Sequence, residues 1–320
     1  MKVEAINCFI SVSETERPST MTPSILAIIL NWNGFDDTVA CIQSLKESTL
    51  QLSSILLLDQ ASPDDSGKKL EQLYQLDKQV MVILNDKNYG FSGGVNIGIR
   101  RALEMGADFV FLINNDTIVD KDCVSLLYDT IKDDLKVAVV GPSILYYSKP
   151  NIIWQAGGYF SKLKMGVIVP SKNMTLSALS QEVAQVSFLT GCALMIRKET
   201  FEQVGYLDTS YFFYMEDVDF SLRVTNSGLR MCYNPIAKVW HKIDDIAVDR
   251  TTPFVLFHIA KSNVIMLRKR FFGFLMLYGL ILQLILYTPF RILQIIKGGS
   301  GFSSGLAWMN GLFHGLIEKV

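Results

Sequence analysis

The sequence predicts an α/β fold with a mostly parallel central sheet, and three observations lead to that prediction. Short apolar stretches recur through residues 24–140, and such stretches are typical of strands buried on both faces of a sheet. Between them, apolar residues recur every three or four positions, as they do on one face of a helix. Strands that alternate with helices pair in parallel, because each helix carries the chain back along the sheet.

The first half of the chain is expected to alternate strands and helices. The stretch 24–30 is apolar and ends at Asn-Trp-Asn-Gly, as a buried strand ends in a loop. The helix expected at 36–47 has Val39, Ile42 and Leu45 on one face. A helix at 66–76 follows from leucines with the same spacing. The full set is strands at 24–30, 54–58, 80–84, 109–113 and 137–140, and helices at 36–47, 66–76, 95–105 and 121–132.

The second half has a less regular pattern. Residues 143–183 contain Pro150, Pro170 and the pair Gly157-Gly158, which predict loops and short antiparallel strands. Regular elements resume after this segment. They are strands at 185–189, 193–197, 230–233 and 237–240, and helices at 198–204 and 216–227.

Composition excludes some classes of protein. The chain has 320 residues, 49% of them apolar, and a net charge of -1. Because nucleic-acid-binding proteins usually have a basic excess, we expect no nucleic acid among the partners. The five cysteines form no C-x-x-C pair, which favours a reducing compartment. Residues 1–23 lack the apolar core of a signal peptide and are expected to form a flexible tail, with Met21 as an alternative start.

Polar side chains follow several of the expected strands. Asn31, Asn33, Asp59, Asn88 and Asp116 all stand at or just beyond strand ends. Ligands of parallel α/β sheets bind beyond the carboxyl ends of the strands. The sequence therefore predicts a binding site at this edge of the sheet.

A Gly-rich loop at 85–94 precedes the third expected helix. Such a loop can bring backbone amides close to a ligand at a helix N-terminus. It follows the third strand, whereas the dinucleotide-binding fingerprint follows the first, so alone it is weak evidence for a site.

Acidic residues and one histidine suggest metal-assisted or acid–base chemistry. Asp116 could hold a divalent cation, or it could simply cap the next helix. The segment 216–219 has three acids beside the aromatic residues 211–214, which could raise a carboxyl pKa, although acids are also common in first helical turns. His241 could be a metal ligand or a residue without chemistry.

Taken in order, these segments resemble the family-2 glycosyltransferases with the GT-A fold, and most closely the rhamnosyltransferase-like branch that builds bacterial surface polysaccharides. The resemblance covers roughly residues 24–270. It is specific for the family and weakly specific for the sugar. The matching segments are 28–34 (IILNWNG), 58–62 (LDQAS), 88–98 (NYGFSGGVNIG), 112–116 (LINND), 190–195 (TGCALM), 213–223 (FYMEDVDFSLR) and 239–241 (VWH).

The resemblance implies a nucleotide-sugar-binding, Rossmann-like domain. Asn31, Asn33 and Asp59 would hold the nucleobase and ribose. Gln60 stands where the family usually has Asn. Asp59 is retained, but the change puts recognition of the nucleobase in question. The residues that would shape the donor pocket are Asn88, Gly90 and Gly93.

The resemblance also implies the catalytic groups of an inverting transferase. Asn115 and Asp116 would lie at the diphosphate, with Asp116 binding Mg²⁺ or Mn²⁺ and His241 completing the metal site. The first acid of the usual D-x-D motif is Asn here, so metal binding would depend on Asp116. Asp217 would deprotonate the acceptor hydroxyl, and Glu216 would lie beside it in the acceptor site.

The C-terminal region has a different composition. We expect a tail at 1–23, a GT-A domain at 24–253 and a helical, membrane-associated region at 254–320. Residues 271–290 carry no charge and follow three basic residues that would stay cytoplasmic. An in-plane or re-entrant segment, a single-pass helix and a buried or oligomeric helical pair all fit this pattern.

The expected activity is transfer of a sugar, rhamnose at the level of the branch, from a dTDP- or UDP-sugar to a lipid-linked glycan at the cytoplasmic face of a bacterial inner membrane. Two alternatives are an inactive relative that acts as a membrane assembly partner and a nucleotidyltransferase. A nucleotidyltransferase would have a basic, Gly-rich phosphate loop after the first strand, where this chain has Asn-Trp-Asn-Gly. The sugar, nucleotide, acceptor and oligomeric state stay open.

Overall fold

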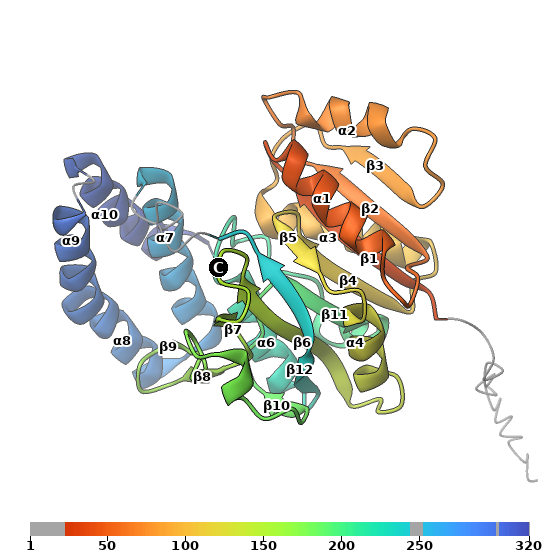
Figure 1. Cartoon of the computed structure of the whole chain (residues 1–320). Coiled ribbons are helices and arrows are strands. Elements are labelled where there is room, and N and C mark those ends of the chain that lie inside the picture. The colour runs from red at the N-terminus through yellow and green to blue at the C-terminus, as the bar shows by residue number, and fades with distance from the viewer. Residues whose placement is uncertain (1–22, 244–251, 299–300, 320) are drawn as a thin grey trace, which may run out of the picture.

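The computed structural model describes residues 23–243, 252–298 and 301–319, so the expected tail lies almost wholly outside the described part. Figure 1 shows a sheet flanked by helices, with the last four helices grouped to one side. The strand order is β10-β12-β6-β11-β4-β1-β2-β3, with β5 paired to β12 and β7 to β6. The α/β class is therefore confirmed.

The first strands pair as the sequence predicts. The strands β1 (Ile25–Asn31), β2 (Ser54–Asp59), β3 (Val80–Leu84) and β4 (Phe109–Asn114) are parallel. Asn31 lies opposite Asp59, and Leu30 opposite Asn114, so these strands end together at one edge. The helices between them are α1 (Phe35–Lys46), α2 (Ser66–Tyr74) and α3 (Gly90–Glu104).

The sheet has a buried layer on each face because its strands alternate apolar side chains between two helical layers. Ile55 and Leu57 of β2 pack on the side of α1, with Ile42. Leu56 and Leu58 pack on the side of α3. Burial on both faces explains why these strands read as unbroken apolar runs.

Several expected boundaries differ from the structure. The third helix begins at Gly90 rather than at residue 95, so most of the Gly-rich loop is its first turns. One strand, β12 (Arg230–His241), replaces two expected strands, with a pairing irregularity between Asn234 and Lys238. The strand β6 (Val137–Tyr146) continues beyond residue 140, and the short β5 (Thr117–Val119) was not predicted.

The second half makes the sheet mixed. The strand β11 (Ala193–Arg197) runs antiparallel to β4 and β6, whereas β12 runs parallel to β6. The other elements are α4 (Cys123–Ile131), α5 (Lys198–Val204), α6 (Glu216–Asn226), β7 (Ile153–Gln155), β8 (Tyr159–Ser161), β9 (Gly166–Ile168), a 3-10 helix at Leu176–Ala178, and β10 (Ala184–Val186) instead of 185–189.

The C-terminal helices are α7 (Pro253–Arg270), α8 (Gly273–Leu282), a π-helical turn (Gln283–Tyr287), α9 (Thr288–Lys297) and α10 (Gly301–Ile317). The continuous helix Gly273–Lys297 is long and apolar enough to cross a membrane, with a mean hydropathy of 1.7 and 11% buried. By contrast, α10 packs closely along α7. A Cβ on Gly311 would lie 2.3 Å from the carbonyl oxygen of Phe257, and one on Gly315 would lie 2.7 Å from the Cβ of Val264.

Candidate active site

Two cavities open at the edge where the parallel strands end. The larger, of about 420 Å³, lies beyond β1 and β4 and is lined by the following residues: Leu30, Asn31, Trp32, Gln60, Asn88, Gly90, Phe91, Leu112, Ile113, Asn114, Asn115, Asp116, Phe212, Phe213, Phe254 and Val255. We call it the first cavity. It combines apolar walls with a few polar groups, as small-molecule sites usually do.

The second cavity, of about 240 Å³, contains most of the acid–base groups. Its lining is Phe91, Asn114, Asp116, Trp154, Thr190, Gly191, Cys192, Phe213, Tyr214, Glu216, Asp217, His241 and Ile243. The two cavities share Phe91, Asn114, Asp116 and Phe213. Asp116 is the one ionisable residue of these four, so a carboxylate stands at the junction of the cavities.

Asp116 and His241 come together from distant segments. His241 is the last residue of β12, which pairs with β5 just after Asp116. The Nε2 of His241 lies 3.1 Å from Oδ1 of Asp116, whose side chain is 38% exposed. The ring of Trp154 meets the imidazole edge-on, with the two ring centroids 4.7 Å apart.

The environment of His241 favours the protonated imidazole, so this residue would bind a cation only on losing its proton. Burial opposes protonation of His241, but Cys192 and the adjacent Asp116 outweigh it and raise the imidazole pKa to about 10. Its Nδ1 is buried without a hydrogen-bond partner. No group of three His, Cys, Asp or Glu side chains that could hold a metal occurs in the described residues. A cation held by this pair would thus need further oxygen ligands, as when substrate phosphates complete a Mg²⁺ site.

Asn31 and Asp59 form one buried cluster. The Nδ2 of Asn31 donates to Oδ1 of Asp59 at 2.6 Å and to the Ser66 hydroxyl at 2.9 Å. The Ser62 amide donates to the other Asp59 oxygen at 2.9 Å. Asn31 is fully buried and borders the first cavity, whereas Asp59 and the exposed Asn33 are not among its lining residues. Nucleotide contact by these three residues stays a prediction, and Asn31 already orients Asp59.

Gln60 supports the entrance to α3. Its Nε2 donates to the carbonyl oxygen of Gly90 at 2.8 Å, and its Oε1 accepts from Asn85 at 3.0 Å. Asn88 accepts from the Gly90 amide at 2.8 Å. Gly90 has φ +71, and a Cβ there would lie 2.5 Å from the Phe212 carbonyl oxygen. This glycine therefore lets the α3 N-terminus approach the segment before α6.

Two other predicted residues have local roles. A Cβ on Gly93 would lie 2.8 Å from the Cβ of Tyr89, and Gly93 is not among the lining residues of either cavity. Asn115 lines the first cavity, and its Nδ2 donates to the Thr38 hydroxyl at 3.0 Å. Gly93 thus allows close packing at the start of α3, whereas a hydrogen bond orients Asn115 toward α1.

Glu216 and Asp217 begin α6 and face the second cavity. Asp217 accepts from the Gly191 amide at 3.2 Å and from the Val218 amide at 2.8 Å. Burial raises the pKa of Asp217 despite these hydrogen bonds. Burial and the neighbouring Asp217 raise the pKa of Glu216 well above its ordinary value, and its Oε2 has no partner. Such an acid can hold or accept a proton near neutral pH.

Some lining residues were not anticipated from the sequence. Phe254 and Val255 enter the first cavity from the first turn of α7, which the expected domain boundary at 253 assigns to the C-terminal region. The sequence does carry a signal for a helix start there, since Thr252 directly precedes Pro253. In the structure the Thr252 hydroxyl accepts a hydrogen bond from the Val255 amide at 3.4 Å. Trp154 comes from β7, a three-residue strand without a clear signal.

Comparison with known proteins identifies the family. The profile described as "Glycosyl transferase family 2" matches residues 26–205, more than half of the chain. A low-salt glycan biosynthesis hexosyltransferase of Haloferax volcanii is 25% identical, with 86% of this chain and 83% of that protein covered. The N-acetylglucosaminyl-diphospho-decaprenol L-rhamnosyltransferase of Mycobacterium tuberculosis is 29% identical over 72% of this chain and 80% of its own length.

Solved structures confirm the GT-A-like fold. The crystal structure of GalNAc-T7 with UDP, GalNAc and Mn²⁺ superposes with a TM-score of 0.62 at 19% identity, covering 77% of this chain and 48% of that one. The mannosyltransferase PcManGT of Pyrobaculum calidifontis, in complex with GDP-Man and Mn²⁺, gives a TM-score of 0.55 at 12% identity, covering 93% and 87%. Together with the family profile, these likenesses show that the chain is a glycosyltransferase that belongs to family 2, with a likeness to its rhamnosyltransferase branch.

Proposed function

We propose that this enzyme transfers a sugar, with inversion, from a nucleotide-diphosphate sugar in the first cavity to an acceptor hydroxyl in the second. The position of Asp116 carries the proposal, because this residue lines both cavities. A group at their junction is next to the bond that must break, whichever sugar is transferred. The rhamnosyltransferase relative makes rhamnose, carried by dTDP or UDP, the first donor sugar to test.

The residues at the junction fit a divalent cation. Asp116 offers an accessible carboxylate and His241 an imidazole nitrogen 3.1 Å from it. Both nitrogen and oxygen ligands suit Mn²⁺, and the carboxylate alone suits Mg²⁺. The cation would neutralise the leaving diphosphate when bound.

Asp217 is proposed as the general base. It would accept the proton of the acceptor hydroxyl, whose oxygen forms a bond to the anomeric carbon as the bond to the diphosphate breaks on the opposite face. The nucleoside diphosphate then leaves, and the proton stays on Asp217. The Gly191 amide holds the Asp217 carboxylate, and Glu216 beside it would contact the acceptor.

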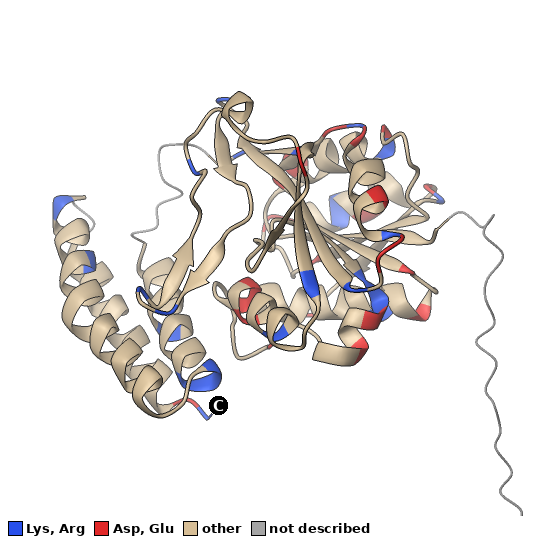
Figure 2. Ribbon diagram, turned by 90° about the horizontal axis from the view of Figure 1, so that it is seen from below, with Lys and Arg blue, Asp and Glu red and all other residues tan. Residues whose placement is uncertain are grey.

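A membrane-borne acceptor fits the C-terminal helices. Figure 2 shows few charges on them, and the residues 252–319 contain one acid, Glu318, against seven lysines or arginines. The helix Gly273–Lys297 exposes large apolar side chains such as Phe274 and Ile285, 78% and 72% exposed. An apolar surface with basic residues binds anionic bilayers. We therefore propose a lipid-linked glycan as acceptor, reached at the cytoplasmic face of the membrane.

The test combines binding and transfer by the full-length enzyme in detergent. Melting temperatures are measured with dTDP- and UDP-sugars, with and without Mn²⁺ or Mg²⁺, and transfer is measured to a polyprenyl-diphosphate-linked sugar. A ligand that binds the folded state raises the melting temperature. We expect a metal-dependent shift that Asp116→Asn removes. We expect Asp217→Asn to lower kcat by about 100- to 10,000-fold while donor binding persists.

Asp129→Asn is the matched control, because within the described part of the chain this exposed acid pairs with Lys132, just beyond the end of α4, and lines neither cavity. It should change neither binding nor turnover. Unchanged turnover in Asp217→Asn would contradict the assignment of the base. Absence of any nucleotide-dependent shift in the wild type would favour the inactive assembly partner.

A further inference from the structure

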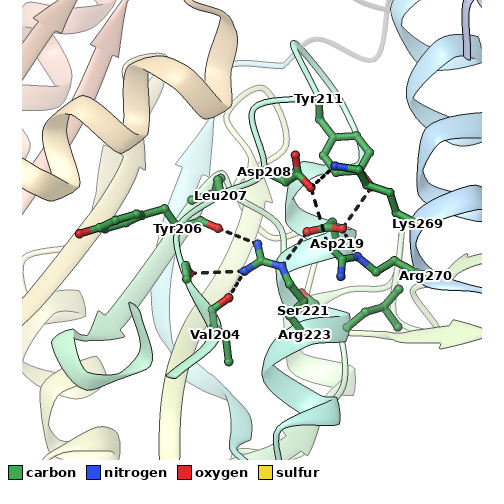
Figure 3. A network of polar contacts seen from close by, with 12 residues as sticks. Val204, Tyr206, Leu207, Asp208, Tyr211, Asp219, Ser221, Arg223, Lys269 and Arg270 are labelled. Carbon is green, nitrogen blue, oxygen red and sulfur yellow. Dashed lines mark hydrogen bonds and ion pairs between the residues drawn. The ribbon is translucent and has the colours of Figure 1, made fainter. Parts of the chain in front are cut away.

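Asp219 is an acid of the 216–219 segment to which the proposed mechanism gives no role. Its side chain is fully buried, at 0% exposed, so an ionised carboxylate there must be paired. Figure 3 shows it between Arg223 and Arg270. The Nε of Arg223 donates to Oδ2 at 2.8 Å, while Oδ1 accepts from the Nε of Arg270 and from the Tyr211 hydroxyl, the latter at 3.1 Å.

The two arginines connect Asp219 to different parts of the chain. Arg223 lies one turn further along α6 and also donates to the carbonyl oxygen of Tyr206 at 2.8 Å. Arg270 is the last residue of α7, in the C-terminal helical region. The residue before it, Lys269, donates to Asp208 at 2.7 Å (Figure 3). The end of α7 therefore forms ion pairs with α6, which begins with Glu216 and Asp217, and with the loop that precedes α6.

The segment leading into α6 needs such support. Tyr214 and Met215, directly before Glu216, have φ of 66 and 70, a left-handed conformation that is unfavourable for residues other than glycine. Such a conformation persists only where surrounding contacts fix it. The Asp219 amide donates to the Met215 carbonyl oxygen at 2.8 Å. From α7, the Ser262 hydroxyl donates to the Phe213 carbonyl oxygen at 3.0 Å.

We propose that Arg270, acting through Asp219, is a positioning residue for Glu216 and Asp217. Asp219 lies three residues beyond Glu216 and two beyond Asp217 in the first turn of the same helix, so its ion pair with Arg270 fixes the position of that turn. Arg270 lines neither cavity. The proposal rests on the assignment of Asp217 as the base. It makes α7 a part of the catalytic centre as well as the link to the apolar helices.

The experiment uses Arg270→Met in the full-length enzyme, which removes the guanidinium and keeps an unbranched side chain. A misplacement of about 1 Å can cost about 100-fold in rate, so we expect kcat per folded enzyme to fall about 10- to 100-fold. The KM for the donor should change less than kcat, because Glu216 and Asp217 line the second cavity and only Phe212 and Phe213 of this segment line the first. Arg270→Lys should restore part of kcat. Asp219→Asn should lower kcat similarly, and the double variant should be little worse than either single one.

Lys198→Met is the matched control. This substitution breaks the ion pair between Lys198 and Asp108. The Lys198 side chain is 28% exposed, close to the 23% of Arg270, and Lys198 lines neither cavity. This variant should keep the wild-type kcat. An Arg270→Met enzyme with the same kcat as Lys198→Met would overturn the proposal, even if its melting temperature were lower.

Amide hydrogen exchange gives a second measurement that does not depend on turnover. Residues 211–219 should exchange faster in Arg270→Met than in Lys198→Met, because the left-handed segment loses a restraint. Equal protection in the two variants would overturn the proposal. If the wild type transfers no sugar, the proposed function fails, and the exchange measurement still decides whether Arg270 positions this turn.

Discussion

Gly94→Ala tests how tightly α3 packs against Gln60, which lines the first cavity. A Cβ at this buried position would lie 1.8 Å from Nε2 of Gln60 and 3.1 Å from a methyl group of Leu30. The Gln60 amide would have to move, and it would lose its hydrogen bonds to Gly90 and from Asn85, as well as a longer one from the Tyr89 amide. Three bonds at about 1 kcal/mol each give a loss of about 3 kcal/mol.

Helix propensity acts in the opposite direction. Alanine is favoured over glycine inside a helix by about 1 kcal/mol, and Gly94 is interior to α3. The free energy of unfolding should therefore fall by about 2 kcal/mol, which lowers the melting temperature by about 3 °C. Because Gln60 also lines the first cavity, the donor should stabilise the variant less than it stabilises the wild type.

Urea and thermal unfolding in detergent, with and without donor, measure both effects. In a Gln60→Ala background the obstructing amide is absent, so Gly94→Ala should become neutral or stabilising by up to about 1 kcal/mol. The reasoning is refuted if Gly94→Ala is neutral in the wild-type background, or if its cost is the same in both backgrounds.

Three further predictions concern the acids, the histidine and the C-terminal helices. Burial and Asp217 raise the folded-state pKa of Glu216, so the contribution of Glu216 to stability should fall as pH rises from its ordinary value of 4.5 toward the raised one. Glu216→Gln has no titrating group at this position and so lacks this pH-dependent loss of stability. Its melting temperature relative to the wild type should therefore increase as the pH rises above 4.5. A difference that does not change with pH would contradict the raised pKa of Glu216. His241→Ala should raise the Mn²⁺ concentration needed for nucleotide-dependent stabilisation by about 10- to 100-fold, and unchanged titrations would exclude it from the metal site. Gly311→Ala should destabilise the protein because its Cβ meets backbone at 2.3 Å, whereas Gly305→Ala, with one contact at 3.8 Å, should stabilise it by about 1 kcal/mol; equal melting temperatures would refute the close packing of α10 on α7.

The parallel half of the sheet was predictable because local pattern and tertiary environment agree there. Stretches such as Ile25–Asn31 are buried on both faces, so their composition directly records their surroundings. Parallel pairing then brings Asn31 and Asp59 into register without any long-range information beyond strand order. Asp116 could be assigned to this edge of the sheet in the same way, because it follows the end of a strand that the sequence predicts.

The remaining features depend on contacts between distant segments. Glycines have a low helix propensity, so the start of α3 at Gly90 was placed five residues late; in the structure those glycines let the helix pack against Gln60 and Phe212. The three-residue β5 forms because β12 passes beside it, and nothing in its own sequence indicates a strand. The sequence indicates that a helix starts near Phe254. It does not indicate that the first turn of this helix lines the first cavity.

Under the proposed function, the geometry of α7 would bring a membrane-bound acceptor and a nucleotide donor to the proposed base, Asp217. This helix of 18 residues is about 27 Å long. Its first turn lines the first cavity with Phe254, and its last residue, Arg270, pairs with Asp219 in the first turn of α6. Along its length it packs against α10 through Gly311 and Gly315, which allow the two backbones to approach closely. A bilayer that holds α8 to α10 would consequently fix the height of Asp217 above its surface. With the lipid-linked glycan proposed as acceptor, the same helix would limit which sugar of the glycan can reach Asp217.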